Sequence, residues 1–321
     1  MFWFIYREKK TKMSIKVLNG DCLEVLDQLT EKSVDTCITS PPYYGLRNYE
    51  REGQIGLEET PEEYVEKMVE VFRKVRRVLK DEGTVWLNLG DSYASNHYTG
   101  ARDSDTGWKH GELSQGYQAR AGGAGGVFKV KDLMGIPWMV AFALRADGWY
   151  LRQDIIWHKP NPMPESVTDR CTKAHEYIFL LSKQKKYYYD HEAIKQPVKE
   201  DWGTRDRTDG KYHNEGTGLS PHTGLEDSYE SANKRSVWTV TTKPFKGAHF
   251  AVFPPDLIEP CVLAGCPEDG TVLDPFGGAG TTGLVADRNG RNAILIELND
   301  EYAEMAIDRL YNDAPLFVDI E

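Results

Sequence analysis

The feature that most constrains the fold is an alternation of strand-like and helix-like segments along most of the chain. The clearest stretch, TVLDPFGGAGTTGLVADRNGRNAILIEL, predicts a strand ending at Asp274, a glycine-rich turn, a helix, and a second strand ending at Glu297. Such a β-α-β unit places its strands side by side in a parallel sheet and its helix on one face. The sequence therefore predicts an α/β fold with a largely parallel sheet.

Apolar periodicity predicts the remaining elements. Strands are expected at residues 15–21, 34–39, 84–89, 150–159 and 175–183, and helices at residues 22–29, 61–83, 132–148, 254–265 and 300–310. Two stretches break this pattern. Residues 97–126 are rich in glycine and are expected to form a flexible loop, and residues 191–235 are polar and are expected to form an inserted lobe.

Composition excludes several classes of protein. The chain has 321 residues, 40% of them hydrophobic, and no apolar run long enough to span a bilayer. Its net charge of −11 disfavours nonspecific coating of nucleic acid, although a local basic cleft stays compatible with DNA binding. Five scattered cysteines without a C-x-x-C pair indicate neither a metal site nor a disulfide framework, and a cytoplasmic location is expected. Residues 1–12 are expected to be an N-terminal extension, with Met13 as an alternative start.

The glycine-rich turn predicts a nucleotide-like ligand. Gly277, Gly278 and Gly280 allow the backbone to approach a ligand closely, and Glu297 stands where an acidic residue accepts hydrogen bonds from ribose hydroxyls. NAD and S-adenosylmethionine both fit this arrangement. The compressed GGAG spacing and Asp274, which suits a cationic ligand, favour S-adenosylmethionine.

A second motif, TSPPYY at residues 39–44, follows the strand-like run VDTCI. The two prolines end the strand, because proline cannot donate to the sheet, and they hold the following backbone extended. Ser40, the Pro41 carbonyl and the Tyr43 ring would then be presented on a stiff support. Such a support is suited to gripping a flat polar ligand.

Together the two motifs resemble those of the beta-class amino DNA methyltransferases. TSPPY resembles the catalytic motif of that family, and DPFGGAGTT resembles its cofactor motif. The resemblance implies a Rossmann-like methyltransferase fold with a circularly permuted motif order, because the catalytic motif comes first. It also implies a catalytic part at residues 13–190, a target-recognition insert at 191–235 and a cofactor-binding part at 236–321. In the insert, arginines such as Arg205, Arg207 and Arg235 would read base edges or phosphates.

The same resemblance implies the site residues. Ser40 and the Pro41 carbonyl would accept the two hydrogens of an exocyclic amine, Pro42 would hold the loop rigid, and Tyr43 would stack on a base flipped out of double-stranded DNA. The residues implied at the S-adenosylmethionine site are Asp21, Cys22, Phe250, Asp274, Phe276, Gly277, Gly278, Gly280, Thr281, Thr282 and Glu297.

Several alternatives stay open at this point. The serine of the catalytic motif favours cytosine N4 as the methylated atom, and adenine N6 is the alternative. An RNA or protein amine as substrate, a catalytically inactive DNA-binding relative and a nicotinamide-dependent oxidoreductase are further alternatives. Cytosine C5 methylation would need a reactive Pro-Cys pair, but Cys261 in DLIEPCVLAG is predicted to lie in the core. A companion restriction enzyme is compatible with the resemblance.

Overall fold

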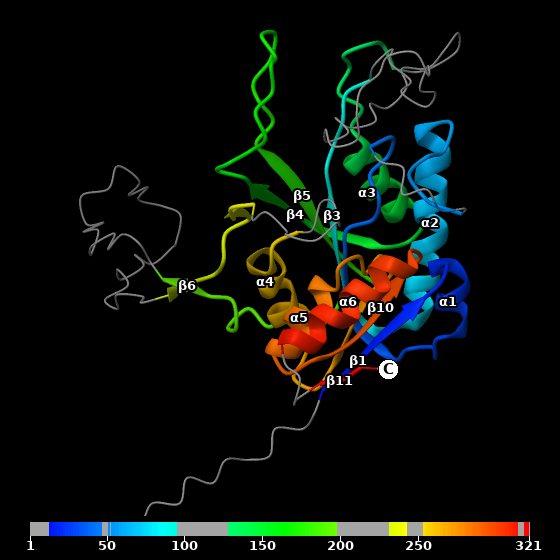
Figure 1. Ribbon diagram of the computed structural model, residues 1–321. Coiled ribbons are helices and arrows are strands. Elements are labelled where there is room, and N and C mark those ends of the chain that lie inside the picture. Colours follow the sequence, from blue (N-terminus) through cyan, green and yellow to red (C-terminus); the bar gives the residue numbers. More distant parts are fainter. Residues whose placement is uncertain are drawn as a thin grey trace, which may run out of the picture.

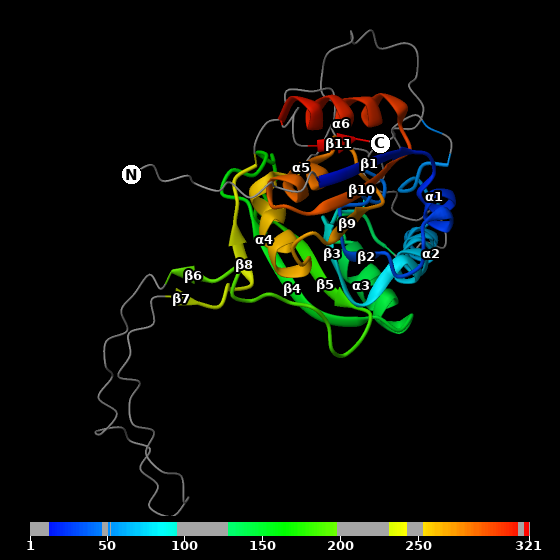
Figure 2. The same cartoon turned by 90° about the horizontal axis from the view of Figure 1, so that it is seen from below.

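The computed structural model describes residues 13–46, 51, 53–94, 128–197, 231–242, 253–313 and 318–320. A nine-stranded sheet lies between two layers of helices, with α1, α2 and α3 on one face and α4, α5 and α6 on the other (Figures 1 and 2). The helices are α1 (Cys22–Gln28), α2 (Pro61–Val78), α3 (Ile136–Ala146), α4 (Pro255–Gly265), α5 (Thr281–Arg288) and α6 (Asp300–Asp313). The strands of the sheet are β1 (Met13–Asn19), β2 (Val34–Thr39), β3 (Leu79–Leu89), β4 (Tyr150–His158), β5 (His175–Ser182), β8 (Val237–Thr239), β9 (Thr271–Asp274), β10 (Asn292–Glu297) and β11 (Val318–Ile320).

The sheet order is β11-β1-β10-β9-β2-β3-β5-β4-β8. Strand β5 pairs antiparallel with both β3 and β4, and the other neighbouring pairs are parallel. The predicted α/β fold with a largely parallel sheet is confirmed. The late strands β9 and β10 lie between the early strands β1 and β2, so the two ends of the sequence are interleaved at the centre of the sheet.

Each helical layer packs through an apolar stripe. Helix α2 begins with a capping box, in which Thr60 accepts from the Glu63 amide and Glu63 accepts from the Thr60 amide. Tyr64, Met68 and Phe72 follow at helical spacing and are fully buried against the sheet. Burial of each such side chain contributes roughly 1.5–3 kcal/mol, so this stripe stabilises the packing of α2 against the sheet.

The sequence-based boundary of α2 was wrong. The helix ends at Val78, not at residue 83, and residues 79–83 are the first part of β3. Leu79 is fully buried and pairs with Val34, so this residue belongs to the sheet and not to the helix. Gly83 permits this path, because a Cβ there would lie 2.4 Å from Leu79 Cγ.

The expected loop at residues 97–126 lies outside the described residues. Of the expected insert at 191–235, the described ends pair with each other, since β6 (Gln196–Pro197) runs antiparallel to β7 (Ser231–Ala232). In the described part of the chain, no helix combines the length and the apolarity required to cross a bilayer.

Candidate functional site

The two motifs meet at the carboxyl edge of the sheet, where β2 and β9 end side by side. The Asp274 carboxylate ties them together. Its Oδ1 accepts from Thr39 Oγ1 at 2.6 Å and from the Phe276 amide at 3.1 Å, and its Oδ2 accepts from Thr282 Oγ1 at 2.6 Å. Burial raises the pKa of Asp274 to about 6, against the opposing effect of these hydrogen bonds. One buried carboxylate therefore fixes the end of β2, the glycine-rich turn and the start of α5 relative to one another.

A single cavity of about 960 Å³, counting the solvent at its mouth, opens along this edge and contains residues of both motifs. From the predicted catalytic motif it is lined by Ser40, Pro41, Pro42 and Tyr43, and from the predicted cofactor site by Asp21, Cys22, Phe276, Gly278 and Glu297. Residues separated by more than 230 positions in the sequence thus share one cavity.

Glu297 is held in place by the backbone around it. Its carboxylate accepts from the Gly278 amide at 2.8 Å and from the Asn299 amide at 2.9 Å. Burial raises its pKa, and the two amides oppose that effect. A carboxylate offers about four lone-pair sites, so Glu297 keeps acceptor capacity for a ligand in the cavity.

The other glycines of the turn pack closely against neighbouring elements, and its two threonines hydrogen-bond within the protein. A Cβ on Gly277 would lie 3.0 Å from Leu295 Cβ, and Gly280 has a φ of +74° with Ala306 close beside it. Thr281 Oγ1 accepts from Arg309 at 2.8 Å, and Thr282 is occupied by Asp274. These residues and Asp274 lie behind the cavity wall rather than on it.

Neighbouring residues hold the loop that contains Pro41 and Pro42 in place. The Tyr64 hydroxyl donates to the Pro42 carbonyl at 2.9 Å. The backbone at Gly56, which has a φ of +104°, passes close to the loop, and a Cβ on Gly56 would lie 3.2 Å from Pro42 Cβ. Tyr43 packs over Gly90, where a Cβ would lie 2.6 Å from the Tyr43 ring. The loop is therefore stiff on both sides, as the two prolines predict.

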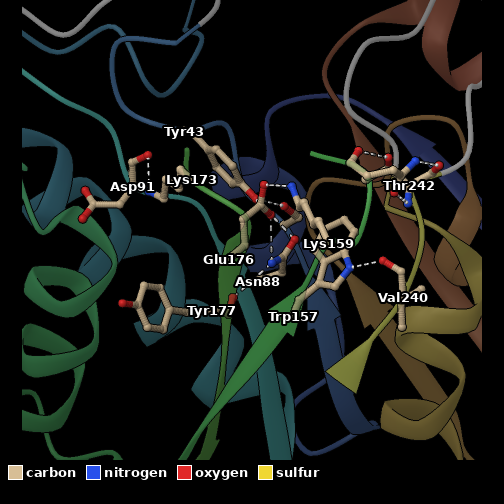
Figure 3. A network of polar contacts seen from close by, with 12 residues as sticks. Tyr43, Asn88, Asp91, Trp157, Lys159, Lys173, Glu176, Tyr177, Val240 and Thr242 are labelled. Atoms are coloured by element: carbon tan, nitrogen blue, oxygen red, sulfur yellow. Dashed lines mark hydrogen bonds and ion pairs between the residues drawn. The ribbon is translucent and has the colours of Figure 1, made fainter. Parts of the chain in front are cut away.

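The Tyr43 hydroxyl takes part in a polar network whose other members lie on β3 and β5 and at the end of β4 (Figure 3). The Tyr43 hydroxyl donates to Glu176 Oε2 at 2.8 Å, and it lies 3.3 Å from Asn88 Oδ1. Asn88 Nδ2 in turn donates to Glu176 Oε2 at 3.3 Å. The ammonium group of Lys159 pairs with Glu176 Oε1 and lies 4.2 Å from the centre of the Trp157 ring.

One further group, Lys173, flanks this network. Lys173 Nζ donates to the Asp91 carbonyl at 2.6 Å, and burial lowers the pKa of this lysine. Burial also raises the pKa of the Tyr43 hydroxyl far above its usual value, and the nearby Glu176 acts in the same direction. Tyr43 thus stays protonated and acts as a donor toward Glu176.

Cys261 is fully buried within α4, and burial raises its pKa. A thiol of this kind is unsuited to nucleophilic attack. The geometry thus argues against a cytosine C5 mechanism through the Pro-Cys pair.

Comparison with known proteins identifies the family. A family model described as DNA methylase, covering N6 and N4 methyltransferases, matches residues 34–308. The chain belongs to this DNA methylase family. Type II methyltransferase M.SmaI of Serratia marcescens is 46% identical over 297 residues, which is 92% of this chain and 91% of that protein. Type II methyltransferase M.Cfr9I of Citrobacter freundii is 44% identical over 92% of this methylase and 88% of its own length.

Solved structures share the fold of the methylase. A DNA modification methylase of Thermus thermophilus, complexed with S-adenosyl-L-methionine, aligns with a TM-score of 0.60 and 24% identity, covering 95% of this chain and 97% of the other. The cytosine-N4-specific PvuII DNA methyltransferase aligns with a TM-score of 0.61 and 19% identity, covering 98% of each chain. At these identities the likeness supports the Rossmann-like methyltransferase fold.

The sequence predicted only part of the lining of this cavity. Phe250, expected near the methionine end of the cofactor, lies outside the described residues. Cavity residues that the motifs did not indicate are Gly20, Leu46, Arg51, Gly53, Gln54, Ile55, Pro275, Ile296, Leu298, Asn299 and Tyr302. Several of them directly follow the ends of parallel strands, a position that is recognisable in the sequence. Glu176 carries no such signal, because it reaches this edge only through the antiparallel direction of β5.

Proposed function

We propose that this methylase transfers a methyl group from S-adenosylmethionine to the exocyclic amine of a base flipped out of double-stranded DNA, with cytosine N4 as the methylated atom. The observation that carries the proposal is the single cavity lined both by Ser40–Tyr43 and by Gly278 and Glu297. A methyl donor held at one end and an amine held at the other would be brought together there.

The residues of the cavity fit S-adenosylmethionine. Glu297, fixed by two backbone amides, has free acceptor sites for ribose hydroxyls, and Gly278 brings the backbone to the cavity wall without a side chain. Asp21, the N-cap of α1, and Cys22 line the same space and would lie beside the adenine. When bound, the cofactor supplies an electrophilic methyl group on a positively charged sulfur.

Asp274 was expected to contact the ligand directly, but its carboxylate is bound within the protein. Its side chain is 1% exposed, and both of its oxygens accept hydrogen bonds from the protein. We infer that it positions the turn and the catalytic strand, and that its charge acts on a bound cation only through the intervening wall.

The proline loop would activate the amine. The lone pair of an exocyclic amine is delocalised into the base, so the amine is a weak nucleophile. If Ser40 Oγ and the Pro41 carbonyl each accept a hydrogen bond from the amine, the nitrogen is held in place and drawn toward tetrahedral geometry. Positioning of this kind supplies much of the rate in reactions that need no covalent intermediate. The Tyr43 ring, braced over Gly90, would stack on the base, a contact worth roughly 1–3 kcal/mol.

Ser40 favours cytosine over adenine. A neutral hydroxyl accepts a hydrogen bond from the amine. Unlike an aspartate at this position, it places no carboxylate charge beside the O2 carbonyl of the cytosine. Adenine N6 presents a similar amidine edge and is the alternative product.

The test is transfer of labelled methyl from S-adenosylmethionine to duplex DNA, with RNA and protein offered in parallel. We expect transfer to duplex DNA, and a loss of transfer in Ser40→Ala with unchanged cofactor affinity by calorimetry. Ser92→Ala, on a residue outside the cavity lining, is the matched control. Transfer to RNA or protein but not to DNA, or no transfer at all, would contradict the proposal.

The remaining assignments concern DNA recognition. We propose that residues 191–235 recognise the target sequence, between the catalytic part at 13–190 and the cofactor-binding part at 236–321. Support comes from the ends of this segment, which pair with each other in β6 and β7 as expected for an inserted unit. The Type II names of the relatives support a role beside a restriction enzyme. Deletion of 198–230 should abolish sequence selection while leaving cofactor affinity unchanged, and loss of cofactor binding would contradict this assignment.

A further inference from the structure

Methylation of an amine leaves one proton to be removed. As the nitrogen lone pair becomes the new N–C bond, the electron pair of the broken S–C bond stays on sulfur, and the nitrogen must lose one of its hydrogens to become neutral. Of the two acceptors proposed above, the Pro41 carbonyl cannot pass a proton onward. The Ser40 hydroxyl can accept one proton and give up another, but it is too weak a base to keep it.

The structure provides a base two hydrogen bonds away from Ser40. Ser40 Oγ donates to the Tyr43 oxygen at 3.4 Å, and the Tyr43 hydroxyl donates to Glu176 Oε2 at 2.8 Å. The first contact is long, as catalytic hydrogen bonds often are before the substrate is bound. Both donors point the same way, from the cavity toward Glu176.

We propose that Ser40, Tyr43 and Glu176 form a proton exit path for the methylated amine. The amine gives a proton to Ser40 Oγ, Ser40 gives its own proton to the Tyr43 oxygen, and Tyr43 gives its proton to Glu176 Oε2. Ser40 and Tyr43 end as neutral hydroxyl groups, and Glu176 ends as a carboxylic acid. The inference rests on the proposed amine methylation.

The surroundings of Glu176 suit a proton acceptor. The ammonium of Lys159 pairs with its other oxygen, and Asn88 Nδ2 donates to Oε2, so the carboxylate has a fixed orientation (Figure 3). Its side chain is 16% exposed and that of Lys159 is 18% exposed, so solvent can reach this end of the path. Glu176 can therefore return the proton to water after each turnover.

Asn88 offers no competing outlet. Its Oδ1 lies 3.3 Å from the Tyr43 hydroxyl, farther than Glu176 Oε2, and a carboxamide does not hold a proton near neutral pH. Its Nδ2 also donates to the Tyr177 carbonyl at 3.0 Å, which fixes the amide in one orientation. Asn88 therefore positions Glu176 and Tyr43.

The test compares Glu176→Gln, Tyr43→Phe and the double variant in single-turnover methylation of a duplex that carries the recognised sequence. Either orientation of the glutamine amide keeps a hydrogen bond to Tyr43, but it cannot take a proton. The path predicts that each single variant is about 100-fold slower than wild type, as for loss of a general base. It also predicts that the double variant is no slower than the slower single variant, because both changes interrupt one path.

The control variant is Glu165→Gln, which removes the charge of another partly buried ion pair, to Arg170, away from the path. A second readout is the fluorescence of 2-aminopurine placed at the methylated position, which reports base flipping in the complex of protein and DNA. We expect equal fluorescence in wild type and in Glu176→Gln.

The outcomes separate this inference from the proposed function. A wild-type protein without methyl transfer contradicts the proposed function and the path with it. An active wild type with Glu176→Gln within threefold of its rate, with additive losses in the double variant, or with reduced 2-aminopurine fluorescence in Glu176→Gln contradicts the path alone.

Discussion

Replacement of Asp274 by asparagine tests how the buried carboxylate holds the site together. Asparagine keeps the size of the side chain and one acceptor oxygen, and the Thr282 hydroxyl can turn to accept from its amide group. The exchange removes the titration of a buried acid, so its effect on the free energy of unfolding changes with pH.

The magnitude of this change comes from the pKa of Asp274, which burial raises from 3.8 to about 6. Because the folded protein binds this proton more tightly than the unfolded chain, the unfolding free energy falls as the pH rises from about 4 to above 6. The full loss at alkaline pH is about 3 kcal/mol, and about half of it is already present at pH 5. Asp274→Asn has no such loss, so its stability relative to wild type should increase by roughly 1–2 kcal/mol between pH 5 and pH 8.

The assay is urea unfolding of both proteins at pH 5, 6, 7 and 8, with Asp308→Asn, an exposed aspartate of α6, as the matched control. Parallel stability curves for Asp274→Asn and wild type across this range would refute the reasoning. Calorimetry with S-adenosylmethionine adds a second distinction. A positioning role predicts an affinity within about threefold of wild type, whereas a direct charge contact predicts a loss of tenfold or more.

Three further predictions concern the cavity. Glu297→Ala leaves the Gly278 and Asn299 amides without their acceptor and removes the ribose contact, so cofactor affinity in calorimetry should fall at least tenfold; an unchanged affinity would remove Glu297 from the cofactor site. Gly90→Ala would place a Cβ 2.6 Å from the Tyr43 ring, so single-turnover methylation should fall while cofactor affinity is kept, and an unchanged rate would show that the position of the ring does not matter. Ser40→Ala should lower turnover about 100-fold without changing cofactor affinity, and a rate within threefold of wild type would exclude Ser40 as an amine acceptor.

The parallel core and the positions of both motifs could be predicted from the sequence, because strand ends followed by Gly-rich or Pro-Pro segments are local signals. The helix boundary at Val78 could not, because Leu79 continues the helical pattern and only its pairing with Val34 places it in the sheet. Asp274 looked like a ligand contact because the sequence does not reveal that Thr39, 235 residues earlier, occupies its oxygen. Glu176 was missed because its place beside Tyr43 depends on the direction of β5, a property of the whole sheet.

The most direct test of the account is mass spectrometry of nucleosides from duplex DNA methylated by the purified protein. Transfer to an exocyclic amine held by Ser40 predicts N4-methyldeoxycytidine as the product, formed about 100-fold more slowly by Ser40→Ala. N6-methyldeoxyadenosine alone would contradict the cytosine assignment and leave amine methylation intact. 5-Methyldeoxycytidine, or no methylated nucleoside, would contradict the central claim that this cavity methylates an exocyclic amine.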